Sequence, residues 1–563
     1  MVTISTAPPL ACAEPPAPEA VGPWWRRRGP VLLLLLGALA LRLVLWDRAV
    51  GFEQGDPLEY VNIAYKLAFG IGIEWWDLRP LLLSLLYVPV LYVAQWWPDP
   101  TGEAMVRALR LTSVLFGVGT VALTYAIGRQ LSGELVGLGA GLLVAVNPVV
   151  NRMSVSTFAE IPSTFFILLS LWLLVRCCER AAPSIRLLAF GAGLALGAGC
   201  MIRYQAIFYL PPVGLWVALL ALVWGAGGLL ARVRSLFDLR QRPGALALGF
   251  GGGLLLAIFI QGVIELIAYG RPFHSLLASF TYNVTSGQAP VEFGEEPFDW
   301  FFREVPSWFG WVAAVLAVLG LVSVVRGRNA AGWRLVTLTG VAMLLALSAL
   351  PHKEARFMSQ VVPLLALLAA QGATMLGRDD LTPRGATMLA RSDLTPRGRD
   401  KSRPYRREEG EISSPVSPSP RRRGGWGVRS SLLLALAAAP MLLASWALDL
   451  EANVGYVYGV KRAAELRPGS IVGTIPWQVA RPYAGTRLTL ERMDRNAWNR
   501  REEVARTIEQ SDFLLFPEYW LLEDREIDRL VEARFRSIEA YDDGVVLYQN
   551  RRLEEPNRRR PRS

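Results

Sequence analysis

Eleven long apolar runs constrain the fold of this 563-residue chain more than any other feature. A helix needs about 20 mostly apolar residues to cross the hydrocarbon core of a bilayer, and several of the runs reach that length. They cover residues 30–46, 104–127, 133–150, 161–175, 185–201, 207–231, 244–268, 307–325, 334–350, 357–376 and 430–449. A soluble protein would not carry so many, so the sequence predicts a polytopic α-helical membrane protein with about eleven transmembrane helices.

Basic residues predict the side of the membrane on which each loop lies. Three arginines at 26–28 precede the first run and place the N-terminus in the cytoplasm, because cytoplasmic loops carry an excess of Lys and Arg. The stretch 79–97 is ambiguous, since a span there would move every later loop to the other side. If 79–97 does not cross, the basic loops, including 232–242 and 378–429, all fall in the cytoplasm. We therefore predict an interfacial or re-entrant helix at 79–97, on the outer face.

This topology divides the chain into six parts. They are a disordered cytoplasmic N-terminus at 1–29, a transmembrane module at 30–376 with outer loops at 50–103, 151–160, 269–306 and 351–356, a disordered basic cytoplasmic loop at 377–429, a last span at 430–449, an outer domain at 450–550 and a basic tail at 551–563. A tandem repeat, 372–384 and 385–397, leads into the basic loop and is too short for a repeat fold.

The outer domain differs in pattern from the rest of the chain. Strand-like stretches at 470–475, 512–517 and 544–550 alternate with helix-like stretches at 501–510 and 525–535, which predicts a small α/β domain. The net charge of +11 lies largely in loops and reports topology rather than nucleic-acid binding. The four cysteines show no CxxC or Cys/His spacing, so the sequence does not predict a zinc site or a disulfide framework.

Ionisable residues recur at predicted span ends on the outer face. Asp56 follows the first span, Glu160 ends the second outer loop, Arg203 lies in the third, and "HKEARF" at 352–357 forms the fifth. Function is the default hypothesis for ionisable groups at a membrane boundary, because they are costly to desolvate. Fixed positive charge stabilises a phosphate leaving group, and a carboxylate can deprotonate a hydroxyl. Together they indicate glycosyl transfer from a polyprenyl-phosphate sugar.

Four stretches resemble a known family in their order and spacing over residues 50–370. "HKEARF" resembles the HKExRF signature of glycosyltransferase family 22, the dolichyl-phosphate-mannose-dependent mannosyltransferases of the C-type superfamily. "EYVNIAYKLAFGIGIEWWDLRPLLLSLL", "IELIAYGRPFHSLLASFTYNV" and "GEEPFDWFFREVPSW" are similar to other loop patterns of that family. In place of the family's Asp-Glu pair the chain has Asp56 between Gly55 and Pro57. The outer domain is similar to the tails of bacterial members, which indicates a prokaryotic enzyme and leaves the acceptor open.

The resemblance implies a role for each candidate residue. Asp56 is the catalytic base, and Glu160, as the second acidic residue, binds the acceptor or the sugar. The implied ligands of the donor phosphate are Arg203, His352, Lys353, Arg356 and Arg79, and the supporting residues are Glu59, Glu74, Glu354, Tyr269 and Asn283. The reaction is expected to be one displacement with inversion at the anomeric carbon. No cofactor and no metal are required, although the carboxylates leave a divalent cation open.

The expected partners are a polyprenyl-phosphate-sugar donor carrying mannose, a glycan, lipid or protein acceptor, and membrane lipids, without nucleic acid. The enzyme is expected in the plasma or inner membrane, with its active site and C-terminal domain outside the cytoplasm. A protein O-mannosyltransferase-like or lipid-modifying enzyme is the alternative within the superfamily. A lipid-linked glycan transporter would need inverted repeats and charges near the middle of the bilayer, which the sequence hardly shows. A structural scaffold leaves "HKEARF" unexplained.

Overall fold

The computed structural model describes residues 24–51, 55–70, 78–96, 102–178, 184–225, 243–286, 288–326, 331–376, 428–475, 477–484, 488–493, 501–518 and 525–553. Some of the predictions fall outside these residues. They concern most of the two tails, the basic loop 377–427 with most of its repeat, and the supporting residue Glu74. The first helix begins at Trp24, so the stretch predicted to be disordered is helical from that residue on.

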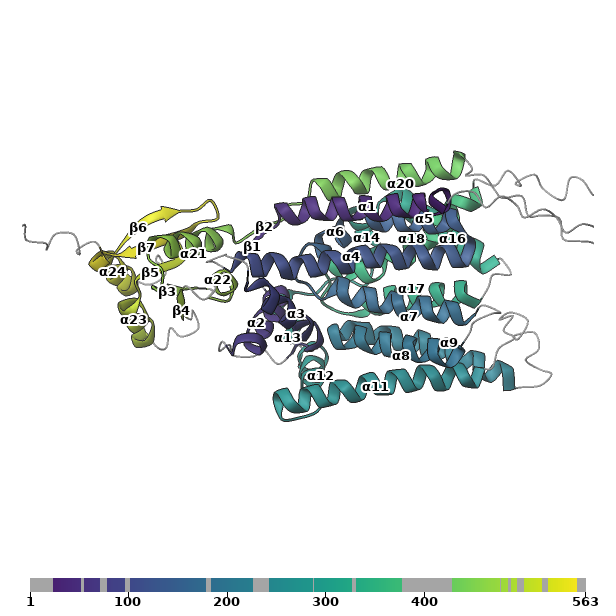
Figure 1. Cartoon of the computed structure of the whole chain (residues 1–563), viewed down its shortest axis with the longest axis horizontal. Helices are drawn as coiled ribbons and strands as arrows, with labels where there is room; N and C mark the ends of the chain where they lie inside the picture. The colour runs from purple at the N-terminus through teal and green to yellow at the C-terminus, as the bar shows by residue number, and fades with distance from the viewer. Residues whose placement is uncertain are drawn as a thin grey trace, which may run out of the picture.

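The transmembrane module is a bundle of long apolar helices that run side by side (Figure 1). They are α1 (Trp24–Arg48), α4 (Glu103–Ser132), α5 (Glu134–Ala145), α6 (Pro148–Ser154), α7 (Glu160–Cys177), α8 (Ile185–Ile202), α9 (Leu210–Gly225), α11 (Pro243–Tyr269), α16 (Trp311–Arg326), α17 (Ala331–Ala349), α18 (Val362–Leu376) and α20 (Val428–Trp446). In the described part of the chain, seven helices are long and apolar enough to cross a membrane, and α5 with α6 adds a span bent by 65°. Shorter apolar helices fill the other predicted runs, which confirms a polytopic helical membrane protein.

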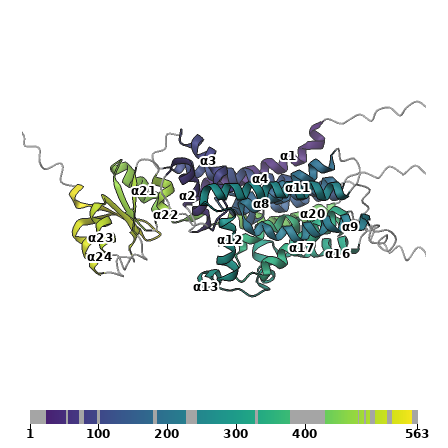
Figure 2. The ribbon, with the colours of Figure 1, turned by 90° about the horizontal axis from the view of Figure 1, so that it is seen from below.

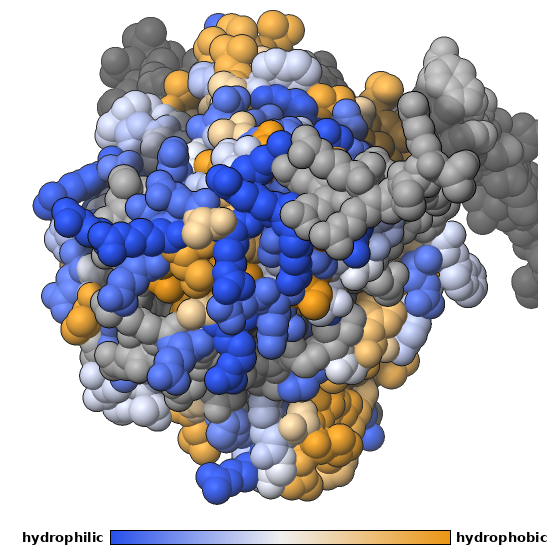
Figure 3. Space-filling model, turned by 90° about the vertical axis from the view of Figure 1, so that its left-hand side faces the viewer, coloured by the Kyte–Doolittle hydropathy of each residue, from blue (hydrophilic) through white to orange (hydrophobic). Residues whose placement is uncertain are grey.

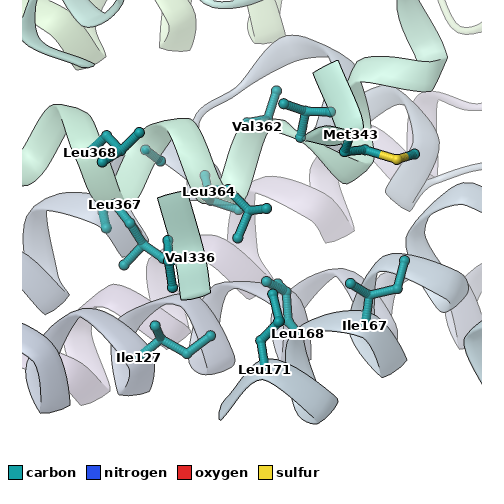
Figure 4. Close-up of a cluster of buried hydrophobic side chains, with 14 of the residues drawn as sticks. Ile127, Ile167, Leu168, Leu171, Val336, Met343, Val362, Leu364, Leu367 and Leu368 are labelled. Atoms are coloured by element: carbon teal, nitrogen blue, oxygen red, sulfur yellow. The ribbon is translucent and has the colours of Figure 1, made fainter. Parts of the chain in front are cut away.

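Apolar side chains fill the bundle and also cover its sides. Inside, side chains of α4 and α7 meet those of α17 and α18 (Figure 4). Outside, Leu255, Phe259 and Ile267 of α11 are 67%, 67% and 82% exposed. The end of the molecule formed by the C-terminal domain is predominantly hydrophilic (Figure 3). Exposed apolar area costs about 25 cal/mol per Å² in water, so the sides of the bundle suit a lipid environment.

Glycines allow helices α8 and α11 to approach closely. A Cβ built on Gly193 of α8 would lie 2.0 Å from the carbonyl oxygen of Phe250 in α11. In the reverse direction, a Cβ on Gly253 of α11 would lie 1.9 Å from the carbonyl oxygen of Phe190. Because no larger residue fits, small residues set the distance between helices that cannot rely on the hydrophobic effect in lipid.

The outer loops gather at the end of the bundle nearest the C-terminal domain (Figures 1 and 2). There α2 (Asp56–Phe69) packs against α3 (Leu82–Ala94). With 13 residues, α3 is too short to cross a bilayer, as expected for the ambiguous stretch 79–97. The other short elements of the module are β1 (Val50–Gly51), η1 (Tyr204–Tyr209), α12 (His274–Phe280), η2 (Thr281–Thr285), α13 (Gln288–Phe293), α14 (Trp300–Arg303), α15 (Val305–Trp308) and η3 (Ala355–Gln360).

The C-terminal domain is built on a five-stranded sheet of order β4-β3-β5-β7-β6. Its elements are β2 (Glu451–Ala452), α21 (Val454–Leu466), β3 (Ile471–Thr474), α22 (Trp477–Ala484), β4 (Thr489–Arg492), α23 (Arg501–Gln510), β5 (Phe513–Pro517), α24 (Arg525–Arg534), β6 (Phe535–Ala540) and β7 (Val545–Asn550). Strands β3, β4 and β5 are parallel, whereas β7 is antiparallel to β5 and β6. Strands β3, β5 and β7 and helices α23 and α24 lie at the positions where the sequence predicts strands and helices, and the extracytoplasmic location of this domain stays a prediction.

The C-terminal domain and the bundle share one hydrophobic core. Tyr60 and Val61 of α2 belong to the same buried cluster as Tyr456 and Val457 of α21. Strand β1, at the end of the first span, pairs in parallel with β2, just after the last span. Arg48 adds a hydrogen bond of 2.8 Å to the carbonyl oxygen of Trp446. The domain therefore rests directly on the helix that begins with Asp56.

Two glycines of α11 offer a matched test of the close helix contact. Gly253→Ala forces a Cβ against the backbone of α8, and overpacking costs about 1–3 kcal/mol. Gly251→Ala meets nothing within 4 Å and replaces a poor helix former with a good one. Thermal unfolding in detergent should show a lower Tm for Gly253→Ala and an unchanged or higher Tm for Gly251→Ala. Equal Tm values for the two variants would contradict the close contact.

Candidate active site

Four charged side chains from separate elements meet at the end of the bundle nearest the C-terminal domain. Asp56 opens α2 and Glu160 opens α7. Arg203 is the C-cap of α8, and Arg356 lies in η3. Helix N-termini favour negative charge and helix C-termini favour positive charge, which suits both carboxylates and Arg203. The site is therefore assembled from helix ends, where side chains can leave the apolar bundle.

Asp56 lies at the centre of three guanidinium groups. Its Oδ2 is 3.3 Å from Nη1 of Arg203 and 3.4 Å from Nη1 of Arg356, and Arg79 donates to its Oδ1. Burial alone would raise the pKa of Asp56, but the three guanidiniums outweigh it and hold the pKa well below its usual range. Asp56 is therefore ionised at neutral pH.

Glu160 is the second anion of the cluster and is fully buried. Its Oε1 lies 3.1 Å from Nη2 of Arg203 and 3.6 Å from Nε of Arg356, so each arginine bridges Asp56 and Glu160. Within the described residues, neither carboxylate oxygen of Glu160 accepts a well-formed hydrogen bond. Buried polar atoms normally have hydrogen-bond partners. Glu160 can therefore still accept a hydrogen bond from the hydroxyl group of a ligand.

Two phenylalanine rings hold the guanidinium groups in place. The ring centroid of Phe357 is 5.5 Å from Cζ of Arg203 and 5.6 Å from Cζ of Arg356. The ring centroid of Phe158 lies 4.8 Å from Cζ of Arg356. A guanidinium within about 6 Å of an aromatic face is attracted to the ring. The arginines are thus oriented before any ligand arrives.

The stretch 352–357 splits into two groups. Glu354 accepts from Arg356, and its Oε1 lies 2.8 Å from Nε2 of His352. Burial raises the pKa of Glu354, but the contacts with His352 and Arg356 lower it below its usual range overall. Lys353 points elsewhere, with Nζ 2.7 Å from the carbonyl oxygen of Glu296 and 2.5 Å from that of Leu350. His352, Glu354 and Arg356 therefore belong to the cluster, while Lys353 fastens a neighbouring loop.

Arg79 and Glu59 extend the cluster along α2. Arg79 donates to Glu59 as well as to Asp56, which is possible because Asp56 and Glu59 lie one turn apart on the same face of the helix. Burial raises the pKa of Glu59 above its usual range, although Arg79 partly offsets this effect. Arg79 thus holds Oδ1 of Asp56, whereas the bridging arginines contact Oδ2.

Two predicted supporting residues lie at the end of α11 and in η2. Tyr269 is the last residue of α11, and its ring centroid lies 5.0 Å from that of His274. Asn283 of η2 is exposed and donates to the carbonyl oxygen of Ser279 at 2.8 Å.

The sequence did not single out a buried polar cluster next to Arg203. Glu265 of α11 is fully buried and accepts hydrogen bonds of 2.9 Å from both the hydroxyl of Tyr204 and the backbone N–H of Ser275. Gln261, one turn earlier, also donates to Glu265. The spacing of Gln261 and Glu265 within an apolar run was the signal that could have revealed it.

The described residues contain no group of three or more His, Cys, Asp or Glu side chains arranged to hold a metal ion. The carboxylates of the cluster are contacted by arginines instead. Catalysis without a cofactor stays a prediction.

The fold and the charged cluster together define the class of protein. The fold is that of a multi-span glycosyltransferase of the C type, with a buried arginine–carboxylate cluster where the bundle meets a C-terminal α/β domain. The chain belongs to the Alg9-like mannosyltransferase family, whose model matches residues 32–397. The resemblance read from "HKEARF" is thereby confirmed.

Known proteins agree with this assignment. Alpha-1,2-mannosyltransferase algn-9 of Caenorhabditis elegans is 22% identical over 336 residues, which cover 56% of this chain and 51% of that protein. The match thus spans about half the length of that relative. Among solved structures, ArnT from Cupriavidus metallidurans bound to undecaprenyl phosphate has a TM-score of 0.61 at 15% identity, covering 92% of this chain and 98% of that chain. The archaeal oligosaccharyltransferase AglB from Archaeoglobus fulgidus, in complex with an inhibitory peptide and a dolichol-phosphate, has a TM-score of 0.54 at 12% identity, covering 95% and 76%.

The position of Asp56 makes its contribution to stability depend on pH. Because its pKa in the folded protein is depressed, Asp56 stabilises the fold above the usual aspartate pKa of about 4, and this contribution is lost as the pH falls toward the folded-state pKa. Asp56→Asn should therefore lower Tm at pH 7, and the difference from wild type should shrink between about pH 5 and pH 3.

Asp47→Asn is the matched control, because the side chain of Asp47 is 73% exposed at the same end of the bundle. It should change Tm little at any pH. A difference between wild type and Asp56→Asn that stays constant across this pH range would argue against the ion pairs.

Proposed function

We propose that the chain transfers a mannosyl residue from a polyprenyl-phosphate donor to an acceptor hydroxyl at the outer face of the membrane, with inversion at the anomeric carbon. The observation that carries this proposal is the buried cluster in which Arg203 and Arg356 each contact the ionised Asp56 at the edge of an apolar bundle. Such a site offers one carboxylate and fixed positive charge within a few ångströms of each other. A lipid phosphate leaving group and a hydroxyl nucleophile need these two features.

The guanidinium groups suit the donor phosphate. Charge develops on the phosphate as the bond to the anomeric carbon breaks, and preorganised cations stabilise that charge. Guanidinium forks match phosphate oxygens in geometry and stay protonated at any physiological pH. The aromatic contacts of Phe357 with Arg203 and Arg356 keep these forks oriented, so little reorganisation is needed when the donor binds.

Donor binding would also prepare the base. In the absence of donor, Arg203 and Arg356 stabilise the anionic form of Asp56, which makes this carboxylate a weak base. The anionic phosphodiester of the donor, by drawing these guanidinium groups toward itself, would lower their hold on Asp56 and raise its basicity. Asp56 would then accept the proton of the acceptor hydroxyl while the hydroxyl oxygen attacks the anomeric carbon. One base and one phosphate leaving group suffice, so a covalent intermediate is not required.

Solved structures with a similar fold support a lipid-linked donor. ArnT was solved with undecaprenyl phosphate and AglB with a dolichol-phosphate, and both share the fold of this chain. The relative algn-9 is named a mannosyltransferase, which favours mannose as the transferred sugar. Basic residues in the predicted cytoplasmic loops support an extracytoplasmic site and C-terminal domain. A protein O-mannosyltransferase-like or lipid-modifying reaction would use the same donor chemistry with another acceptor.

Asp56→Asn tests the base. The variant keeps the size of the side chain but cannot accept the proton, so transfer should fall by about 100-fold or more. The measurement is the rate at which radiolabelled mannose is transferred from polyprenyl-phosphate mannose to acceptors by full-length protein in nanodiscs. Binding of undecaprenyl phosphate should persist, and Asp47→Asn should behave as wild type. Near-normal turnover in Asp56→Asn would remove Asp56 as the base.

Variants of Arg356 and Lys353 distinguish direct contact with the donor phosphate from an indirect effect through a neighbouring loop. Arg356→Gln removes a guanidinium from the cluster and should raise the donor KM and lower kcat, for a loss of about 100-fold or more in kcat/KM. Lys353→Ala frees the loop that carries Glu296 and should weaken donor use less than Arg356→Gln does. Arg462→Gln, an exposed arginine of α21, is the control and should change neither constant. Unchanged donor kinetics in Arg356→Gln would exclude its phosphate role.

A further inference from the structure

A buried carboxyl group lies near the end of the lipid-facing helix α11. Glu265 is fully buried, whereas its neighbours Leu266 and Ile267 are 50% and 82% exposed. An ionisable side chain within an apolar span is costly to bury, and function is the default hypothesis for it. Glu265 is not one of the four residues of the arginine–carboxylate cluster, so its burial needs a reason of its own.

Hydrogen bonds from three segments of the chain converge on Glu265. Its Oε1 accepts from the hydroxyl of Tyr204, the first residue of η1, at 2.9 Å, and its Oε2 accepts from the backbone N–H of Ser275 in α12 at 2.9 Å. Gln261, one turn earlier in α11, and the hydroxyl of Ser275 also donate to Oε1. Glu265 therefore joins the starts of η1 and α12 to α11.

Tyr204 is next to Arg203 in the chain. Arg203 caps the C-terminal end of α8 with an extended backbone, φ −151° and ψ 121°, and η1 begins with Tyr204. Gln205, on the other side of Tyr204, accepts a hydrogen bond of 2.8 Å from Nε of Arg203. The backbone that carries Arg203 is thus held between the end of α8 and a tyrosine that is fastened to α11.

The contacts of Arg203 depend on the position of this backbone. Its Nη1 lies 3.3 Å from Oδ2 of Asp56 and its Nη2 lies 3.1 Å from Oε1 of Glu160, so one planar fork serves two separate partners. In an active site, a displacement of about 1 Å can lower the rate about 100-fold. A shift of the junction between α8 and η1 would disturb both contacts at once.

A polar network suits this task better than apolar packing does. Replacing both partners of a buried hydrogen bond by apolar groups of the same shape can be nearly neutral for stability, so a carboxyl group is not needed merely to join α11 to η1. A satisfied polar network instead specifies one arrangement. Helix α11 is a firm base for such a network, because its glycines bring it into close contact with α8, the helix that ends at Arg203.

We propose that Glu265 is a positioning residue of the transferase. Through Tyr204 it holds Arg203 where the guanidinium group bridges Asp56 and Glu160 and is presented to the donor phosphate. The meeting of Arg203 with a phosphate rests on the proposed function. Glu265 touches neither donor nor acceptor, so its effect on transfer passes through Arg203.

Tyr204→Phe tests this link, because it removes one hydroxyl group and leaves Glu265 the hydrogen bonds from Ser275 and Gln261. Transfer from polyprenyl-phosphate mannose is measured with full-length protein in nanodiscs. Tyr204→Phe should lower kcat/KM for the donor about tenfold. In an Arg203→Lys background, which has already lost the guanidinium fork, it should lower kcat/KM by less than about twofold, because the two residues act as one unit. Glu265→Gln, which replaces one acceptor oxygen, should behave as Tyr204→Phe does.

Tyr125 and Glu134 provide a matched control. The hydroxyl of Tyr125 donates to Glu134 at 2.8 Å, so Tyr125→Phe removes the same kind of tyrosine–glutamate hydrogen bond outside the cluster. It should leave kcat/KM unchanged and lower Tm equally in the wild-type and Arg203→Lys backgrounds. In the ligand-free protein, Tyr204→Phe should lower Tm less in Arg203→Lys than in wild type.

The Tm and transfer measurements separate this inference from the proposed function. If Tyr204→Phe and Arg203→Lys are non-additive in Tm but the wild-type protein does not consume polyprenyl-phosphate mannose, the anchoring of Arg203 stands and the transferase function fails. If the wild-type protein transfers mannose and Tyr204→Phe lowers kcat/KM by the same factor in both backgrounds, the loss does not pass through Arg203 and the positioning role fails. Wild-type kinetics in Tyr204→Phe would overturn that role as well.

Discussion

The double bridge from Arg203 and Arg356 to Asp56 and Glu160 is the interaction on which the rest of the structure depends. Four charged groups meet where an apolar bundle ends: Asp56, Glu160 and Arg203 are buried and Arg356 is partly buried, and each would be costly to desolvate without a partner. Their opposite charges compensate one another, and their contacts join α2, α7, α8 and η3 at a single point. Everything else at this end, from the aromatic contacts to the domain resting on α2, is arranged around that point.

A network of this kind combines stability with readiness to bind an anion. The guanidinium groups already face carboxylates, so under the proposed function a donor phosphate would exchange one set of anions for another instead of entering an apolar space. Phe357 contacts Arg203 and Phe158 contacts Arg356, and these contacts would help to keep the guanidinium groups in place. Glu160, whose oxygens lack well-formed hydrogen bonds, is the partner best able to turn toward a substrate hydroxyl.

The sequence was informative wherever a residue's environment depends on its own neighbours in the chain. Apolar runs located the helices, and charges at span ends put Asp56, Glu160, Arg203 and Arg356 on one face, where the structure brings them into contact. It could not show that Lys353 turns to backbone carbonyls while Arg356 enters the cluster, because that depends on the path of a short 3-10 turn. The burial of Glu265 and the pairing of β1 with β2 depend on contacts between distant segments and leave no local pattern.

The pairing of β1 with β2 has a consequence for biosynthesis. Strand β1 ends the first span that leaves the ribosome, but its partner follows the last span, so the pair cannot form until nearly the whole membrane module has been made. Until then α2 lacks the side chains of α21 that complete its core. The helix that presents Asp56 therefore acquires its final support late, and an incomplete chain would hold the arginines and carboxylates without the frame that aligns them. The order of translation thus delays assembly of the site until the span α20 and strand β2 have been made.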